Sequence, residues 1–177
     1  MIEFVLKNRR LRLHPDGVMY LRDHWGGKET KNEKWNEIKF YKTPKGYLDC
    51  QITVDGKDRH FRKHRLVKLA HDPTFDIFDV SPNNCIDHEN HTRDDNSNDN
   101  LRVVTNQQNH FNRSNVKGYC WNKTRKKWTA YIGLDGKKIN LGGFKTEDEA
   151  RNAYLKAKPI YHVIAAPPAP GHAALED

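Results

Sequence analysis

The chain has 177 residues, of which 36% are hydrophobic, and a formal net charge of +8 at pH 7. Its mean hydropathy of −0.98 leaves room for only modest cores, in one domain or two small ones. No run of 18 apolar residues predicts a transmembrane helix, and the evenly charged first twelve residues do not form a signal peptide.

The first 63 residues predict an antiparallel sheet. β-type stretches alternate here with turn sequences such as Asp55-Gly56. The three expected strands are Gly17–Tyr20, Gly46–Val54 and His60–Arg62. The polar segment Lys28–Lys39 is expected to be a loop that Trp35 and Ile38 anchor.

The middle of the chain predicts a strand, a loop, a second strand and a short helix. Cys85–His88 is the first strand, and the β-branched Leu101–Thr105 is the second. Between them, Glu89–Asp99 consists mostly of polar residues that cannot bury a core face, so it is expected to be a loop. A short helix follows, capped by Thr105 or Asn106.

Four side chains of this stretch suit a phosphodiesterase that uses one metal ion: Asp87, His88, Asn100 and Asn109. Carboxylate and amide oxygens are ligands for a hard cation such as Mg²⁺ or Mn²⁺. Histidine can accept a proton from water near neutral pH. An isolated Asp-His pair is usually a solvated turn, but the two carboxamides at matching positions favour a site. Packing of the two strands on the helix would bring Asp87, His88 and Asn109 together.

Residues 64–112 resemble the HNH family of nucleases, in the branch found in phage homing endonucleases. The sequence HRLV at His64–Val67 is similar to the start of a helix in that branch, Asp87-His88 to its D/N-H pair, and NLRVVT at residues 100–105 to its NLRWVT strand. The resemblance implies that Asp87 and Asn109 bind the metal ion and that His88 is the general base. It also implies that Asn100 hydrogen-bonds across the loop to hold His88 in place.

Two features depart from the family pattern. Glu89-Asn90-His91 stands where Asp-Gly-Asn is frequent, and Val103 replaces a tryptophan. Three further histidines have other interpretations. His64 is expected to support the site structurally rather than as a ligand, His110 to be either structural or a phosphate contact, and His91 either to touch DNA or to face solvent.

Charge is distributed unevenly along the chain. Residues 1–63 carry a net charge of +6, residues 64–114 of −3, and residues 115–160 of +7. A metal site between two DNA-holding arms would have a weakly acidic centre between basic segments, as here. Charge that only confers solubility would give the same net charges for the three segments. Cys50, Cys85 and Cys120 form no C-x-x-C motif, so they indicate core residues in a reducing compartment rather than a zinc or redox site.

The C-terminal segment predicts a three-stranded sheet followed by a helix. Its expected strands are Gly118–Lys123, Lys127–Ile132 and Lys138–Phe144. Asp135-Gly136 is a hairpin turn, and Thr146 before a run of acidic residues predicts a helix that ends near residue 157, helped by Pro159. One face of this helix carries Ala150, Ala153, Tyr154 and Ala157. The opposite face of the sheet is expected to carry Trp121, Lys123, Arg125 and Trp128 or their neighbours.

Residues 115–161 are similar to the DNA-binding domain of plant ethylene-response factors, also called the Apetala-two domain, in the strand pattern and in the helix sequence TEDEARNAY. The resemblance implies that the sheet binds the major groove. The positions that would contact DNA are Lys117, Tyr119, Trp121, Lys123, Arg125, Lys127, Trp128 and Tyr131. Lys117 and Tyr119 stand where arginine is common, which predicts fewer bidentate guanine contacts. One of the two tryptophans is alternatively a residue of the sheet core.

Together these features predict an α+β protein with an N-terminal β-rich DNA-contacting region (1–63), a ββα-metal core (64–114), a DNA-binding domain (115–161) and a disordered tail (162–177). The expected function is a homing-type DNA endonuclease with one Mg²⁺ or Mn²⁺ ion. Its expected partner is duplex DNA, with neither a membrane nor a nucleotide cofactor, and it would act as a monomer or dimer in the cytoplasm, that of the host if a phage encodes it. The alternative is a DNA-binding regulator with a vestigial nuclease core.

Overall fold

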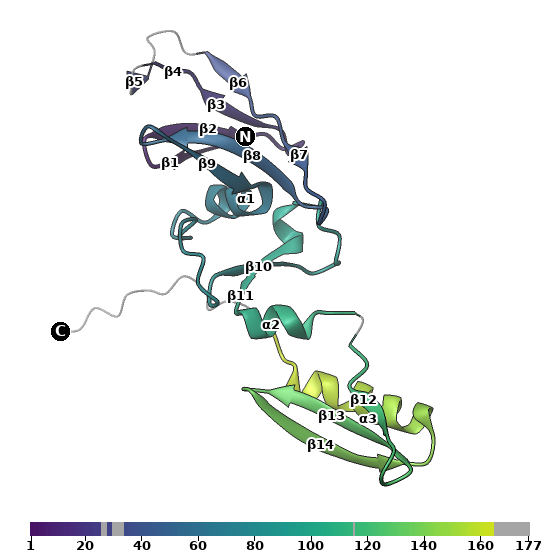
Figure 1. The fold of residues 1–177 in the computed structure, drawn as a ribbon. Coiled ribbons are helices and arrows are strands. Elements are labelled where there is room, and N and C mark those ends of the chain that lie inside the picture. Colours follow the sequence, from purple (N-terminus) through teal and green to yellow (C-terminus); the bar gives the residue numbers. More distant parts are fainter. Residues whose placement is uncertain (26–27, 30–33, 115, 165–177) are drawn as a thin grey trace, which may run out of the picture. The chain divides into compact units, whose positions relative to one another are not determined.

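The protein forms two compact units, residues 1–103 and 104–177, in a computed structural model that describes residues 1–25, 28–29, 34–114 and 116–164 (Figure 1). The predicted α+β class is confirmed, since several antiparallel sheets occur and a three-stranded sheet packs on one helix. Most of the predicted tail, residues 165–177, lies outside the described residues. The domain limits after residues 63, 114 and 161 remain predictions.

The first unit begins with a sheet that the sequence analysis missed in part. Its strands are paired in the order β1 (Ile2–Leu6), β2 (Arg9–Leu13), β3 (Met19–Arg22) and β6 (Trp35–Glu37). Every second residue of β1 and β2 is buried, which is the period of a strand with one face in the core. The expected strand Gly17–Tyr20 overlaps β3. The short β4 (His24–Trp25) and β5 (Lys28–Glu29) form a separate pair.

The predicted loop Lys28–Lys39 is wrong where β5 and β6 form, and its residues 30–33 lie outside the described residues. Polar composition indicated a loop, but the backbone of β6 is paired with β3. The Trp35 ring also receives the Arg12 guanidinium, whose central carbon lies 3.8 Å from the ring centroid.

A second sheet of β7 (Tyr41–Lys42), β8 (Leu48–Val54) and β9 (Lys57–Arg62) leads into helix α1 (Lys63–His71), which lies against β1, β8 and β9. The buried face of α1 carries Leu66, Val67, Leu69 and Ala70. From the same helix, the Arg65 guanidinium donates hydrogen bonds to carbonyls of residues 76, 77, 79 and 84. These bonds fix the segment that enters β10 (Cys85–His88), so α1 determines where the candidate site begins.

In the second unit, α2 (Asn106–Phe111) precedes the sheet β12 (Tyr119–Asn122), β13 (Lys127–Leu134) and β14 (Lys137–Phe144), on which α3 (Glu147–Tyr161) packs. Thr105 and Thr146 each form a capping box, with Gln108 and Glu149 respectively. The Phe111 ring stacks on the His162 ring at a centroid distance of 4.0 Å, which ties α2 to the end of α3.

The core of the second unit lies between β13 and α3. Ile132 packs there with Tyr154 and Ala157, as the predicted helix face requires. The predicted end of α3 near residue 157 is wrong, because the helix continues through Pro159, which removes only one backbone donor in the last turn. Gly118 has a φ of +65°, and a β-carbon there would collide with the Tyr154 ring.

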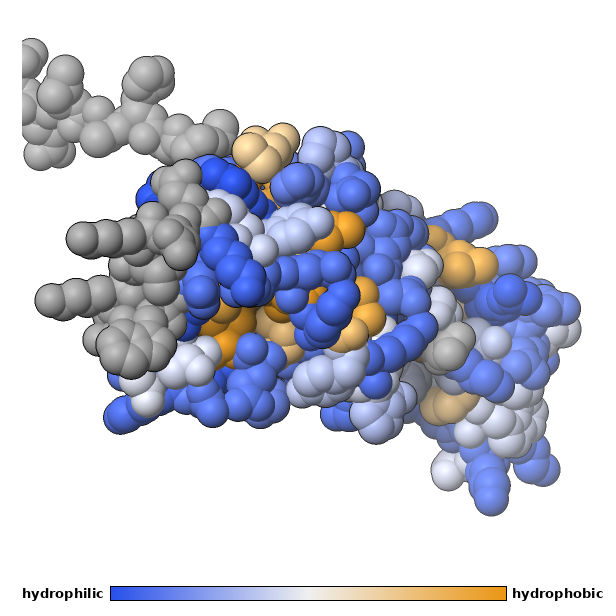
Figure 2. Space-filling model, turned by 90° about the horizontal axis from the view of Figure 1, so that it is seen from above, coloured by the Kyte–Doolittle hydropathy of each residue, from blue (hydrophilic) through white to orange (hydrophobic). Residues whose placement is uncertain are grey.

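No helix among the described residues is both long and apolar enough to cross a membrane. The face drawn in Figure 2 is mostly hydrophilic, with hydrophobic residues scattered in small groups.

Candidate functional site

Asp87 and His88 end strand β10 and are buried, with 6% and 5% of their surface exposed. β10 is paired with β11 (Leu101–Val104), the strand after the polar loop. A solvated turn would leave both side chains exposed, so that interpretation of the Asp-His pair is wrong. Buried polar groups need partners to offset their lost hydration, and both residues have them.

The partner of Asp87 is Arg102 on the neighbouring strand β11. Its Nε and Nη2 donate to Asp87 Oδ2 at 3.0 and 2.7 Å. The same guanidinium approaches a Glu89 carboxylate oxygen at 3.6 Å. A carboxylate has about four acceptor positions on two oxygens, so Arg102 and a divalent cation can share one carboxylate. Asp87 thus fits Mg²⁺ or Mn²⁺ as a hard oxygen ligand that a guanidinium already orients.

His88 has the electrostatic setting of a neutral imidazole. Burial lowers its pKa below the ordinary value, against a hydrogen bond to Asn96 and the charges of Asp87 and Asp95, which raise it. His88 Nε2 lies 3.4 Å from Asn96 Oδ1. An imidazole with a pKa below 6.5 is neutral at pH 7 and can accept a proton.

His64 and Tyr47 form aromatic contacts around His88. The His64 ring centroid lies 5.2 Å from that of His88, and the Tyr47 centroid lies 6.0 Å from it. Burial, helped by His88 and two nearby arginines, lowers the pKa of His64 to about 3. His64 is therefore a neutral packing partner of His88, which supports the interpretation that it has a structural role.

The loop after β10 is held together by Asn100. Its Oδ1 accepts a hydrogen bond from Asn90 N at 3.0 Å, and its Nδ2 donates to the Asp95 carbonyl at 2.8 Å. The Glu89 N–H donates to the Asn100 carbonyl at 3.0 Å. Asn100 is buried, and both ends of its side chain bind loop backbone. It can thus position His88 through the loop that follows it.

Asp87, His88 and Asn100 therefore lie together in the first unit, whereas Asn109 belongs to α2 in the second unit. The role of Asn109 as a metal ligand stays a prediction that the sequence resemblance carries. His91, at a φ of +63°, and His110 are both exposed, and their possible DNA contacts also stay predictions.

The strand register sorts the aromatic residues of the second unit. Trp121 is paired with Trp128, and Tyr119 with Ala130. Paired residues point to the same side of a sheet, and sides alternate along a strand. All of these residues therefore lie on the side of Ala130 and Ile132, which are buried under α3. The expectation that Trp121 and Trp128 lie on the face opposite the helix is wrong.

The two tryptophan rings contact each other at a centroid distance of 5.6 Å, and Tyr119 contacts Trp128 at 6.1 Å. Trp121 keeps 45% of its surface exposed. The three rings thus form an aromatic cluster that extends the helix-covered face. Contact with DNA by any of them stays a prediction.

The open face of this sheet carries a different set of residues. It includes Lys127, Thr129, Tyr131, Lys138 and Asn140. Lys138 Nζ lies 3.4 Å from the centroid of the Tyr131 ring, which is a close cation–π contact. Only Lys127 and Tyr131 of the five were predicted to contact DNA, although Thr129, two residues from each of them on the same strand, lies on the same side of the sheet. The bulge between β13 and β14 hid the other two from counting by twos along the strands.

Three predicted DNA contacts lie outside the strands. Lys117 precedes β12, and Lys123 and Arg125 belong to the turn between β12 and β13. All three are exposed, and the Arg125 N–H donates to Asn122 Oδ1 at 3.0 Å, which orders the turn. Their exposure is compatible with phosphate contacts, and their role stays a prediction.

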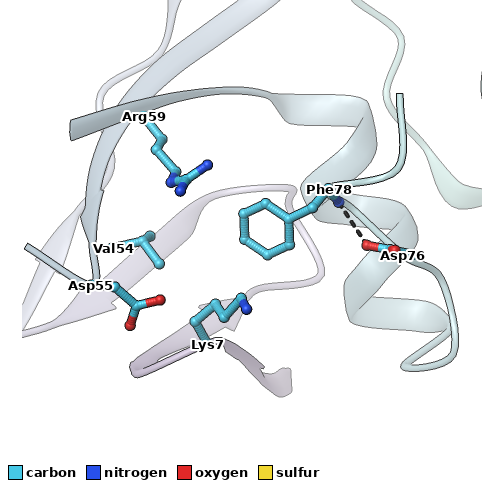
Figure 3. Close-up of a pocket in the computed structure, with 6 residues that line it drawn as sticks. All are labelled: Lys7, Val54, Asp55, Arg59, Asp76 and Phe78. Atoms are coloured by element: carbon cyan, nitrogen blue, oxygen red, sulfur yellow. Dashed lines mark hydrogen bonds between the residues drawn. The ribbon is translucent and has the colours of Figure 1, made fainter. Parts of the chain in front are cut away.

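A separate cavity of about 340 Å³ lies in the first unit (Figure 3). Its lining residues are Lys7, Val54, Asp55, Arg59, Asp76 and Phe78. Lys7 and Arg59 both approach the Phe78 ring, at 5.3 and 5.5 Å from its centroid. Two cations and two carboxylates balance one another here, so the cavity does not select a charged ligand. None of the candidate catalytic residues lines it.

Among the described residues, no three His, Cys, Asp or Glu side chains gather as a metal-binding group. A cation bound at Asp87 would therefore need amide, water or phosphate oxygens as further ligands. The three cysteines are not joined in disulfides, and Cys50 is buried, where burial raises its pKa to about 12. A thiol with that pKa is not a nucleophile at neutral pH.

No family model matches the sequence, and no curated protein matches it. The chain is similar to a solved structure described as "DNA binding and cleavage by the HNH homing endonuclease I-HmuI". The similarity covers 75% of this chain and 70% of that chain, with 22% identity and a TM-score of 0.39. Similarity this low leaves the function to be argued from the residues of the chain itself.

Proposed function

We propose that the protein is a metal-dependent endonuclease of the HNH type that hydrolyses phosphodiester bonds in duplex DNA. The observation that carries this proposal is the pair of buried polar residues at the end of β10. A neutral imidazole, His88, directly follows a carboxylate, Asp87, that Arg102 orients. A proton acceptor next to a hard oxygen ligand is what metal-assisted hydrolysis of a phosphodiester needs.

His88 would take a proton from the attacking water. A bond forms between the water oxygen and phosphorus, the bond from phosphorus to the 3′ oxygen breaks, and the leaving 3′ oxygen takes a proton from solvent water. The products are a 5′-phosphate and a 3′-hydroxyl. Asp87 and Asn109 would hold one Mg²⁺ or Mn²⁺ ion, which stabilises charge on the phosphate and on the leaving oxygen. Asn100 would keep the loop, and with it His88, in position.

The second unit would bind the duplex. Its basic charge and the open sheet face with Lys127, Tyr131 and Lys138 support this role, because exposed cations can contact phosphates and exposed polar side chains can reach base edges. The exposed Lys117, Lys123 and Arg125 would add phosphate contacts. The aromatic cluster of Tyr119, Trp121 and Trp128 would also contact the duplex.

The test is incubation of supercoiled plasmid with the protein in Mg²⁺, in Mn²⁺ and in excess EDTA, followed by sequencing of the ends. Metal-dependent cutting that leaves 5′-phosphates supports the proposal, and full cutting in EDTA contradicts it. One site per chain would cut one strand, so linear product that increases with the square of protein concentration would indicate a dimer.

The second candidate function is a DNA-binding regulator with an inactive core. The observation that favours it is the double hydrogen bond from Arg102 to Asp87 Oδ2, since a carboxylate neutralised by a guanidinium can remain without metal. The same plasmid experiment separates the two functions. A regulator would shift the mobility of DNA in every metal condition and leave all strands intact.

A further inference from the structure

Two arginines from distant parts of the sequence meet at one tyrosine ring in the first unit. The central guanidinium carbon of Arg62 lies 4.3 Å from the centroid of Tyr47, and that of Arg93 lies 5.1 Å from it. Arg62 ends strand β9, Tyr47 ends the turn before β8, and Arg93 belongs to the loop after His88. We call Tyr47, Arg62 and Arg93 the Tyr47 clamp.

The clamp is held in place by contacts between the turn and the loop. Arg93 Nη1 donates to the Lys45 carbonyl at 2.7 Å, and Lys42 Nζ forms an ion pair with Asp94 Oδ2 at 2.6 Å. Gly46, at a φ of +84°, lets the chain turn between Lys45 and Tyr47. These contacts fix Arg93 near the ring, and Arg62 reaches the same ring from the end of strand β9, so the clamp is a preformed arrangement.

Neither Arg62 nor Arg93 forms an ion pair with a carboxylate in the part of the chain that the structure describes. Other cations of the first unit do: Arg12 with Glu3, Lys42 with Asp94, and Arg102 with Asp87. Two like charges near one ring repel each other, and an anion bound between them would relieve that repulsion. A guanidinium has five N–H donors, so Arg93 keeps donors beyond the one that binds Lys45.

The clamp lies beside the candidate base. The Tyr47 ring centroid is 6.0 Å from the His88 ring centroid, and 5.5 Å from that of His64, which packs on His88. A phosphate bound by the clamp would therefore be close to the residue that is proposed to activate water. Phosphates of one strand follow one another about every 3.4 Å along the duplex axis, so when the clamp holds one phosphate, the next phosphate of that strand can lie at His88.

We propose that Tyr47, Arg62 and Arg93 bind a backbone phosphate of nucleic acid next to the one that is cut. Both guanidiniums contact the ring of Tyr47, and the guanidiniums bind the anion. The clamp residues are positioning residues, because they act on a phosphate beside the reacting one. The inference rests on the proposed function for its cleavage consequence, but its binding consequence is independent of cleavage.

The experiment measures binding of a labelled duplex in excess EDTA, where no metal-dependent cutting occurs, across a range of salt concentrations. The variants are Arg62→Gln, Arg93→Gln and the double variant, with Arg151→Gln on the exposed face of α3 as a charge-matched control. The double variant should reduce the slope of log K against log salt by about 0.9, the value for one phosphate contact on duplex DNA, and each single variant should reduce it by less. Arg151→Gln should leave the slope unchanged.

Because Arg62 precedes α1, its variant is checked by thermal unfolding, and the exposed Arg93 provides an independent second position. Tyr47→Phe should retain binding, whereas Tyr47→Leu should weaken it, since only the former keeps the ring that both guanidiniums contact. In Mg²⁺, the clamp variants should raise KM several-fold and leave kcat nearly unchanged. That split differs from the loss of kcat expected when the base itself is removed.

The clamp proposal is overturned if Arg62→Gln and Arg93→Gln both show the same salt slope and the same DNA affinity as Arg151→Gln, whatever the cleavage result. A wild-type protein that never cuts DNA would instead overturn the proposed nuclease, while a reduced slope in Arg62→Gln and Arg93→Gln would still support the clamp.

Discussion

The end of β10 and the open face of the β12–β14 sheet meet opposite requirements. Asp87 and His88 are buried, and Arg102 and Asn96 provide polar partners for them. Lys127 and Lys138 are exposed, and they can contact a large ligand directly. Proton transfer benefits from burial, which tunes a pKa, whereas recognition of a polyanion needs accessible charge. Substitutions at the end of β10 should therefore reduce the rate of cleavage, whereas substitutions on the open sheet face should reduce the affinity for DNA.

The largest expected effect is on the rate of cleavage. His88→Ala should reduce cutting by roughly 10²–10⁴-fold, the usual contribution of a general base, with duplex affinity changed only a few-fold. Cleavage time courses and gel shifts measure the two quantities. His71→Ala, at an exposed histidine that ends α1, is the matched control. A His88→Ala variant that cuts at the wild-type rate would remove His88 from the mechanism.

Asp87→Asn should impair both metal use and stability. Without the carboxylate, the partly buried Arg102 keeps its charge but loses its ion pair with Asp87 and retains only the longer contact with Glu89, so the free energy of unfolding should fall by about 2–3 kcal/mol. Urea denaturation measures this loss, and Mn²⁺ titration measures the affinity for metal. Adding Arg102→Gln to Asp87→Asn should recover part of the stability but not the metal affinity. Asp94→Asn, at an exposed ion pair, should change stability little.

Acid should destabilise the first unit through His64. Its pKa is near 6.5 in the unfolded chain and about 3 in the folded one, so only the unfolded state gains a proton between these values. The contribution of His64 to the free energy of unfolding is complete above about pH 6.5. It falls by about 2 kcal/mol when the pH is lowered to 5. Urea denaturation at both pH values should therefore give a smaller difference for His64→Gln than for the wild type. His71→Gln should behave like the wild type.

The smallest expected effect distinguishes the two faces of the C-terminal sheet. The double variant Lys127→Gln/Lys138→Gln should reduce the salt slope of duplex binding by about 1.8, or two phosphate contacts, and lower the free energy of unfolding by at most about 1 kcal/mol through the lost contact of Lys138 with Tyr131. Trp128→Ala should instead lower the stability of the second unit by about 2 kcal/mol, because it removes a ring from the aromatic cluster. Equal salt slopes for the lysine pair and for Arg151→Gln/Lys156→Gln on α3 would exclude the open face as the DNA-binding surface.

Short-range sequence signals predicted those parts of the fold that depend on residues close together in the chain. Thr146 was identified as a helix cap, and Thr105 was one of two candidates for the other, because a capping box needs only four consecutive residues. The strand that ends at Asp87-His88 was likewise predicted. The hairpin of β1 and β2 was not, although Phe4 and Leu6 alternate with exposed residues, because the even spread of charge in this segment was used only to exclude a signal peptide.

The contacts that define the sites come from residues far apart in the sequence. Arg102 reaches Asp87 across a strand pair, and Arg62 and Arg93 meet at Tyr47 only after two sheets and a loop have folded. Residue type and spacing could identify Asp87 and His88 as candidate site residues. They could not reveal that one is held by a guanidinium and that the other is packed against two aromatic rings.

Gly118 and Tyr154 also have a consequence for the divergence of this chain over time. The absence of a β-carbon at residue 118 is what gives the Tyr154 ring its place under the sheet, and the positive φ of Gly118 disfavours any other residue. A substitution at either position alone either clashes or leaves a void. Among descendants of this sequence, the two positions should therefore change together or not at all, and a glycine paired with a large aromatic ring 36 residues later should mark chains that keep this packing.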